Sequence, residues 1–487
     1  MNPEDKLRDM LRSGAGSATP KVPSWQEFAP VAHRSILMRR LATAGAAVVV
    51  LAGAAVAYTL VPGGGGTKPV ASPTTASGSP VPTHASGCPR AEAPSFGDLG
   101  AVAFVRRTGL HVVDLAGRTE RVIDDALAPQ VPPDLHWSPD GRWIAFDGNR
   151  LAPATLGAAC SPLPLGYSIV GWVPGSELFV AMTNREGLVI GSPGGDVKTL
   201  LPDGWGVTDA LIDPRGTSVA VARVVGDPSH PQETGIYTVD LSSGKTTQIQ
   251  RFPGADASSV LPRLASWSPD GAWLLYWRGA GSASLASDGG ELYAVAATGA
   301  SPTKVTEMLM DRDMLDWCGD TLVAASGLGR ELDQNKRLIT AAPPDWKAAE
   351  VPSQPPGSVY WPSCSPDGKS VSATVVDPGQ KGNVMAPKNW IAVIDFEGVT
   401  GAGLSPATGG GFSANTFSSE FPEWSPKPVP GQSQAILFVG RGDVHHQSGA
   451  LYLERGEQIS KVADLGSVGL GYYGYYDYAR RVAWYQP

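Results

Sequence analysis

Charged side chains are scarce in this sequence of 487 residues, and basic ones are outnumbered by acidic ones. Its 38 Lys and Arg stand against 46 Asp and Glu, a net charge of −8, which excludes a nucleic-acid binder that works by bulk positive charge. The GXY period of collagen is absent although Gly and Pro are abundant. Because 42% of the residues are apolar, a wholly disordered chain is excluded too. The composition therefore predicts a folded protein that is rich in turns and contains many strands.

Common catalytic and metal-binding motifs are also missing. The sequence contains no GxSxG nucleophile elbow, no HExxH, no DxDxDG calcium loop and no CxxC. We therefore expect a protein that is not an enzyme and that holds no metal ion or cofactor.

Two clusters of polar residues are candidate metal sites. Asp443, His445 and His446 lie close together, but a metal needs a defined set of three or four ligands, so a solvated loop is favoured. An acidic run offers carboxylate oxygens of the kind that bind Ca²⁺, and a polar loop is again favoured because the calcium-loop spacing is missing. This run contains Asp311, Asp313, Asp316 and Asp320.

Helical periodicity is nearly absent, and one apolar run stands apart. Residues 41–61 carry no charge, and at about 1.5 Å per residue they are long enough for a hydrocarbon core of about 30 Å. Residues 1–40 hold seven basic and four acidic side chains, with Arg39 and Arg40 beside the run. The positive-inside rule predicts a single-pass cell-membrane protein with residues 1–40 in the cytoplasm. A cleaved signal peptide is the alternative, because Ala55 and Ala57 form an AxA-like site.

The next segment is rich in Pro, Gly, Ser and Thr. Residues 62–97 contain little that could enter a core, which predicts a disordered linker between the membrane and an ectodomain at 98–487.

The four cysteines all follow the apolar run. An even number in an exported domain favours disulfides over metal or redox chemistry. Three pairings are possible, and neighbours in sequence are the preferred partners: Cys88 with Cys160, and Cys318 with Cys364. Four buried free thiols are the alternative.

One short phrase recurs along the ectodomain. It reads Trp-Ser-Pro-Asp-Gly before a short apolar run, and Ser, Pro and Gly there favour a tight turn leading into a strand buried on both faces. Full copies begin at Trp137, Trp267 and Cys364, and degenerate copies at Trp172, Asp213, Trp317 and Trp424. The Asp residues of the full copies are predicted to serve the turn and not catalysis: Asp140, Asp270 and Asp367.

The spacing of the apolar strands matches that of propeller blades. They start 34 to 65 residues apart, near Val102, Ile144, Leu178, Val219, Leu274, Leu322, Val371 and Ile436. The phrase WSPDGxxIAF, followed by an alternating strand such as residues 236–241, resembles the WD40-like repeats of TolB-type β-propellers and of prolyl oligopeptidase relatives. The resemblance covers residues 98–487 and implies an all-β propeller. TolB has six blades, whereas the spacing here predicts seven or eight four-stranded blades, with eight preferred.

Ring closure is expected between the two ends of the ectodomain. A propeller can complete its first blade with a strand from the other terminus. Residues 482–485 are predicted to pair with residues 102–105.

A tyrosine-rich segment is the candidate binding surface. Six of the 13 tyrosines fall in the last 16 residues, and Tyr offers amphipathic contact area at low entropic cost. Packing at the closure of the ring is the alternative. The candidates are Tyr472, Tyr473, Tyr475, Tyr476 and Tyr478.

These features predict a binding or scaffold module of the cell envelope whose partner is a protein or a glycan. The ectodomain is acidic, so anionic polymers are poor partners. The alternative is a transmembrane sensor in which residues 1–40 contact a cytoplasmic partner, since Leu7, Met10 and Leu11 share one helical face. A third possibility, a lyase or hydrolase, would need carboxylates and His clustered near the propeller axis.

Overall fold

The computed structural model describes residues 87–487, which lie within one compact unit, Ala57–Pro487. Excepted are the segments 125–133, 228–229, 254–260, 280–288, 329–334, 377–388, 397–417, 429–434, 442–447 and 468–481, and the single positions 107, 147, 156, 158, 353 and 457. No helix among the described residues is long and apolar enough to cross a membrane, and the predicted segment 41–61 lies outside them.

The described chain is all-β and every sheet is antiparallel. The first four groups of strands are β30 (Val482–Tyr485) with β1 (Ala101–Arg106), β2 (Gly109–Asp114) and β3 (Thr119–Asp124); β4 (His136–Trp137), β5 (Trp143–Phe146) and β6 (Arg150–Pro153); β7 (Ser168–Trp172), β8 (Phe179–Met182), β9 (Leu188–Gly191) and β10 (Val197–Leu201); and β11 (Val207–Ile212), β12 (Ser218–Asp227), β13 (His230–Asp240) and β14 (Thr246–Pro253).

The second half repeats the pattern. Its groups are β15 (Leu261–Trp267), β16 (Trp273–Gly279), β17 (Gly289–Ala296) and β18 (Thr303–Leu309); β19 (Leu315–Cys318), β20 (Thr321–Ser326), β21 (Arg337–Ala341) and β22 (Ala349–Glu350); β23 (Ser358–Cys364), β24 (Ser370–Val376) and β25 (Asn389–Asp395); and β26 (Ser418–Trp424), β27 (Ala435–Arg441), β28 (Ser448–Arg455) and β29 (Gln458–Ser467). The strands β15–β22 count as one sheet only because Met308 pairs with Ser326.

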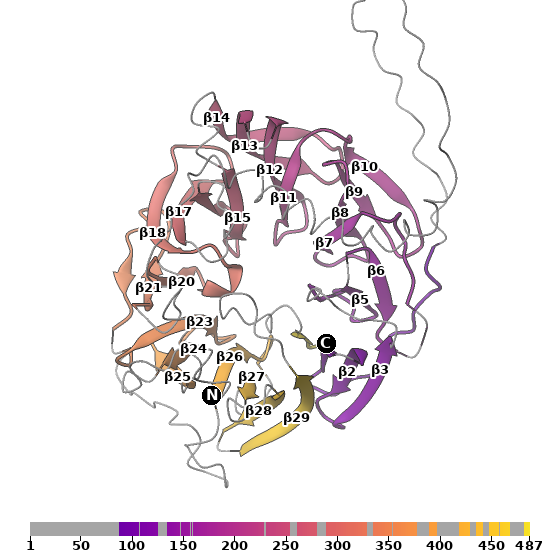
Figure 1. Ribbon diagram of the computed structural model, residues 1–487, viewed down its shortest axis with the longest axis vertical. Coiled ribbons are helices and arrows are strands. Elements are labelled where there is room, and N and C mark those ends of the chain that lie inside the picture. The colour runs from indigo at the N-terminus through magenta and orange to yellow at the C-terminus, as the bar shows by residue number, and fades with distance from the viewer. Residues whose placement is uncertain are drawn as a thin grey trace, which may run out of the picture. The chain divides into compact units, whose positions relative to one another are not determined.

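The groups follow one another around a ring, as Figure 1 shows. We call the first strand of each group its inner strand: β30, β4, β7, β11, β15, β19, β23 and β26. Inner strands of neighbouring groups contact each other, for example β4 with β7, β7 with β11 and β23 with β26. Apolar side chains fill the space between sheets, and the predicted apolar strands are buried on both faces, as β5 and β8 show. This arrangement is a β-propeller, as predicted.

The predicted closure of the ring is confirmed. β30 pairs with β1 through Val102 and Trp484 and through Ala103 and Ala483. The Trp484 indole N–H also donates to the Leu99 carbonyl at 2.8 Å, across 385 residues of sequence.

The Ser-Pro-Asp-Gly phrase forms the turn between the first two strands of a group. Ser138 Oγ donates to Asp140 Oδ1 at 2.6 Å and accepts from the Trp143 backbone N–H at 2.9 Å. Gly141 has φ of +68°, a left-handed conformation that side chains other than Gly disfavour. The copies at Ser268 and Ser365 make the same bonds. The Asp of each full copy therefore serves the turn, as predicted.

The Trp of the phrase joins neighbouring blades. Its indole N–H donates to the inner strand of the preceding group, with distances of 2.9 to 3.0 Å. The pairs are Trp137 with the Ala483 carbonyl, Trp172 with the His136 carbonyl, Trp267 with the Leu211 carbonyl and Trp317 with Ser266 Oγ.

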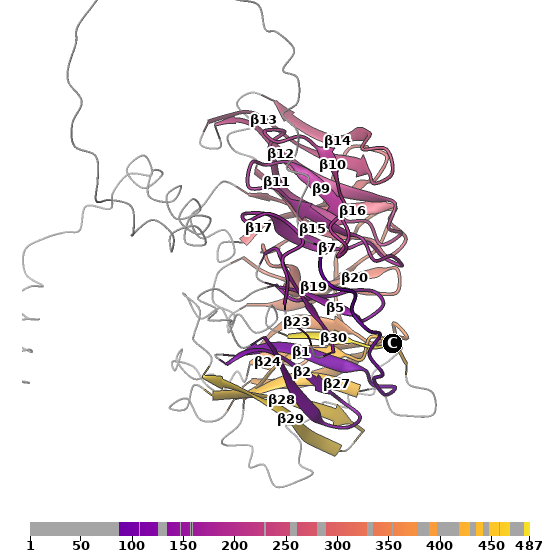
Figure 2. The ribbon, with the colours of Figure 1, turned by 90° about the vertical axis from the view of Figure 1, so that its right-hand side faces the viewer.

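The two faces of the ring differ in their connections. Antiparallel order puts the Ser-Pro-Asp-Gly turns and the turns between third and fourth strands on one face, which we call the turn face. The strand ends that flank 280–288 and 468–481 lie on the opposite face, and the two sides can be compared in Figure 2. Cys88 contacts the turn face, where its N–H donates to the Pro193 carbonyl at 2.6 Å.

Both preferred disulfides are present. Cys88 pairs with Cys160 and Cys318 with Cys364, with Cα–Cα distances of 5.6 and 5.2 Å. The first fixes the start of the described chain to the β4–β6 sheet, and the second joins β19 to β23.

Candidate functional site

A cavity of about 300 Å³ lies among the inner strands β19, β23, β26 and β30, with strands β27 and β28 behind it. The short 3₁₀ helix η2 (Arg312–Met314), which precedes β19, borders it too. Its polar lining includes Asp316, Ser363, Glu423 and Arg312, and its aromatic lining includes Trp361 and Phe421.

The three polar strand residues occupy one repeated position. Asp316 and Glu423 each precede the Trp of a repeat, and Ser363 precedes Cys364, which replaces that Trp. Because the inner strands lie side by side, the same step in three successive blades brings these side chains to one cavity. The repeat that builds the turns therefore also places the polar lining.

Two aromatic residues line the cavity in a strained backbone conformation. Trp361 and Phe421 have φ of +51° and +53°, a region that costs a bulky residue on the order of 1–3 kcal/mol. Each precedes a Pro inside a β-bulge, where β23 and β26 skip two residues of the ladder. Their rings stack with centroids 3.6 Å apart at 23°. Such strain persists only where surrounding structure holds it, and it concentrates at functional sites.

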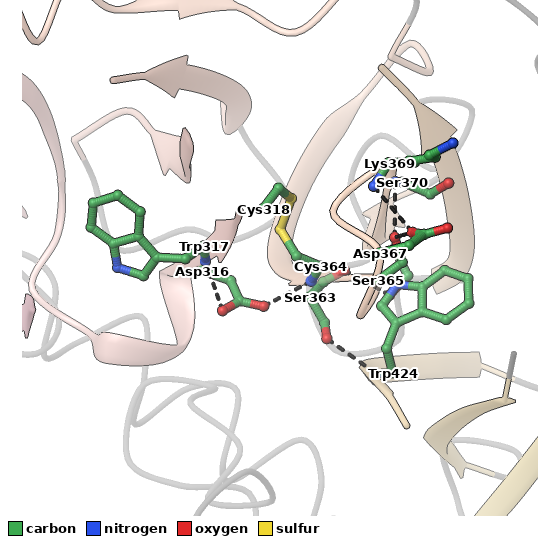
Figure 3. The surroundings of a disulfide bond; sticks show 11 residues. Asp316, Trp317, Cys318, Ser363, Cys364, Ser365, Asp367, Lys369, Ser370 and Trp424 are labelled. Atoms are coloured by element: carbon green, nitrogen blue, oxygen red, sulfur yellow. Dashed lines mark hydrogen bonds between the residues drawn. A yellow bond between two sulfur atoms is a disulfide. The ribbon is translucent and has the colours of Figure 1, made fainter. Parts of the chain in front are cut away.

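The Asp316 carboxylate is held in place by two backbone donors, as Figure 3 shows. Oδ1 accepts from the Trp317 N–H at 2.8 Å, and Oδ2 accepts from the Cys364 N–H in the next blade at 2.7 Å. The disulfide between Cys318 and Cys364 joins the two strands at this point. Burial raises the pKa of Asp316, and the two N–H donors oppose that rise.

Glu423 carries a second carboxyl group with a raised pKa in the cavity. Burial, reinforced by the negative charge of Asp316, raises its pKa to about 7. The side chain keeps some solvent exposure although protein surrounds it on most sides. At neutral pH the group is therefore divided between its acid and its carboxylate form, and it can give or take a proton.

Arg312, the cation among the described lining residues, is already engaged. Arg312 Nη2 donates to both carboxylate oxygens of Asp209 in β11, at 3.0 and 3.2 Å, and its Nε donates to the Leu264 carbonyl at 3.1 Å. Across the ring, burial lowers the pKa of His136 in β4, the positive charge of Arg312 lowers it further, and Asp134 opposes both. Carboxylates, a guanidinium and an imidazole thus come from four inner strands and η2.

The structure describes only some of the candidate site residues that the sequence analysis named. Tyr472, Tyr473, Tyr475, Tyr476 and Tyr478 lie outside the described residues, as do Asp443, His445 and His446. Asp311 caps η2 by accepting the Asp313 N–H, Asp320 is exposed in a turn, and Asp313 and Asp316 line the cavity. In the part of the chain that the structure describes, no group of three or more His, Cys, Asp or Glu could hold a metal ion.

Sequence reasoning missed Glu423 and placed Asp316 in a loop, although it lies in β19. One signal could have found both: the position before the repeat Trp is occupied by His136, Ser266, Asp316 and Glu423 in different blades. Polar residues at a fixed step of a buried inner strand indicate a shared polar surface.

No family model matches the sequence, and no curated protein matches it. Solved structures similar to the chain include oligogalacturonate lyase from Vibrio parahaemolyticus (13% identity, 73% of this chain and 97% of that one, TM-score 0.42). Others are TolB from Acinetobacter baumannii (16%, 68% and 68%, TM-score 0.32) and a puromycin-hydrolyzing peptidase from Mycobacterium tuberculosis (13%, 79% and 57%, TM-score 0.41). At such identities the likeness concerns the fold alone, and it includes the TolB-type propellers that the repeats resemble.

The comparisons correct one prediction. The chain was expected not to be an enzyme, yet most of the solved structures that it resembles are enzymes, among them a lyase, prolyl endopeptidases and the tricorn protease. The prediction failed because it rested on missing motifs such as GxSxG, and side chains from separate blades can meet in one cavity without leaving any contiguous motif.

Proposed function

We propose that this protein is a membrane-anchored, eight-bladed β-propeller outside the cytoplasm that binds a protein or glycan ligand of the cell envelope in its central cavity. The observation that carries the proposal is the cavity itself, where polar groups from three successive blades converge beside a strained aromatic pair. Clefts with a few convergent polar groups and perturbed pKa values are where proteins commonly bind ligands.

The location outside the cytoplasm is supported by the cysteines. All four form disulfides, which persist in oxidising compartments. Cys88 lies within the predicted linker 62–97, so its bond to Cys160 fixes that segment to the propeller, and its N–H contacts the turn face.

Filling the cavity tests the proposal. Val482 lines it from β30, and Val482→Trp adds an indole to the cavity wall. We expect the full-length wild-type protein to capture a defined envelope protein or glycan from intact cells, and Val482→Trp to retain less than about a tenth of it. Val122→Trp, at an exposed position of the outer strand β3, is the matched control and should capture normally.

Equal capture by both variants would contradict the proposal. The sensor alternative makes a different prediction, because it requires residues 1–40 alone to retain a cytoplasmic regulator. If that fragment binds one while the propeller captures nothing, the sensor becomes the better account.

A further inference from the structure

We propose that the cavity holds the cationic group of a protein partner, a Lys ammonium or an Arg guanidinium, between Asp316 and Glu423 and against the ring of Phe421. This inference rests on the proposed function and names the chemistry of its ligand.

The charges of the cavity favour a cation. Among the residues that the structure describes, its charged lining consists of Asp313, Asp316, Glu423 and Arg312, and Arg312 is bound to Asp209 by two hydrogen bonds. The strand and bulge residues that complete the wall carry no charge, including Leu437, Val439 and Val482. Two partly buried carboxylates repel each other unless a proton or a cation lies between them, and a buried charge needs a partner.

The aromatic wall favours a cation on a side chain over a bare metal ion. Phe421 lines the cavity, is partly exposed and stacks on the buried Trp361, which fixes the plane of its ring. The face of an aromatic ring attracts ammonium and guanidinium groups. The left-handed backbone of Phe421 and the Pro that follows keep this ring in position before any ligand arrives. A divalent metal would need three or more ligands, and the described residues offer no such group.

Proton release is the signature that distinguishes such a ligand. A cation next to Glu423 stabilises its carboxylate form, so binding below about pH 7 expels the proton that the free carboxyl group carries. Asp316 adds to the proton release, because its negative charge is one of the causes that raise the pKa of Glu423. The affinity should therefore rise with pH, on the order of tenfold per unit well below pH 7, and level off above it.

Calorimetry on the full-length protein in detergent tests the inference. The probes are a blocked Gly-Lys-Gly peptide, the same peptide with Arg, and the Lys peptide acetylated on Nζ. We expect the Lys or Arg peptide to bind with release of up to one proton at pH 6, seen as a dependence of the heat on the buffer. The acetylated peptide should bind at least about tenfold more weakly.

Two variants remove one carboxylate each at nearly constant shape. Glu423→Gln should weaken the binding of the cationic peptide about tenfold or more and abolish proton release, and Asp316→Asn should weaken binding as well. Glu177→Gln, an exposed acid in a turn of another blade, is the control and should change neither. Thermal melting of each variant shows whether it is folded.

Three results would overturn the inference: no binding of either cationic peptide at millimolar concentration, equal binding of the acetylated peptide, or wild-type binding by folded Glu423→Gln. These outcomes are separate from failure of the proposed function. If Val482→Trp still abolishes capture while no cationic peptide binds, the cavity is a ligand site of another chemistry.

Discussion

Glu423 illustrates how one side chain links the stability of the ring to its central cavity. Its pKa is raised from 4.5 to about 7, so the folded protein binds a proton more readily at this carboxyl than the unfolded chain does. Between these values the folded state holds more protons, and stability falls as the pH rises through that window. The loss of stability caused by ionising Glu423 is complete above about pH 7 and absent below about pH 4.5.

Replacing this carboxyl should therefore stabilise the protein only at higher pH. Glu423→Gln is expected to have a larger free energy of unfolding than the wild type at pH 8, by up to about 3 kcal/mol, and a similar one at pH 4.5. Urea denaturation of both proteins across this range measures the difference. Parallel pH profiles would show that the carboxyl is not perturbed in the folded state.

Single strands and turns depend on local bonds that recur from blade to blade. Ser268 is buried, donates to Asp270 and accepts from the Trp273 N–H. The same hydrogen bond lowers the pKa of Asp270. Loss of the hydroxyl leaves the Trp273 N–H without this partner inside the protein.

Ser268→Ala is therefore expected to reduce the free energy of unfolding by about 1–3 kcal/mol. Ser243→Ala is the control, because Ser243 makes similar bonds in an exposed turn, and it should cost less than about 0.5 kcal/mol. Chemical denaturation at constant pH compares the two. Equal losses in the two variants would mean that burial of the Ser268 turn does not increase the contribution of its hydrogen bonds to stability.

How far the sequence predicts structure differs between elements. β5, β16 and β24 follow from the turn phrase and from apolar runs, because both signals are local. The bulges of β23 and β26 do not, since two skipped residues leave the apolar pattern almost unchanged while they turn Trp361 and Phe421 toward the cavity. Asp316 and Glu423 lie 107 positions apart in the numbering, and only the closed ring brings both to one cavity. A neighbour that distant cannot be inferred from local pattern.

At the scale of the molecule, stability depends on the last strand. β30 supplies the inner position of the first blade, and Trp484 packs in a cluster with Phe104 and Leu437 from the blades on either side of the closure. Gln486 adds two bonds, to the Asp98 carbonyl and from the Lys427 N–H.

Removing residues 482–487 should therefore open the ring. Losing the aromatic core residue Trp484 alone should lower the free energy of unfolding by several kcal/mol, on the order of the cost of other large-to-small core changes. We therefore expect a melting temperature lower by about 10 °C or more. We also expect the molecules to associate through the exposed edge of β1. Differential scanning calorimetry and size-exclusion chromatography measure both. Gln486→Ala, which keeps the strand, should elute at the same volume as the wild type. A truncated protein with the elution volume and the melting temperature of the wild type would show that the ring does not need this strand.

The pairing of β30 with β1 also sets the order in which the blades can be completed during synthesis of the chain. The residues joined by the Trp484 indole are 385 positions apart, and ribosomes add roughly 5–20 residues per second. For roughly 20 to 80 s after Leu99 is made, the partner of β1 does not yet exist. The blade that is begun first is the one completed last, so every nascent chain passes through a period in which the other blades can form while the first still waits for its inner strand.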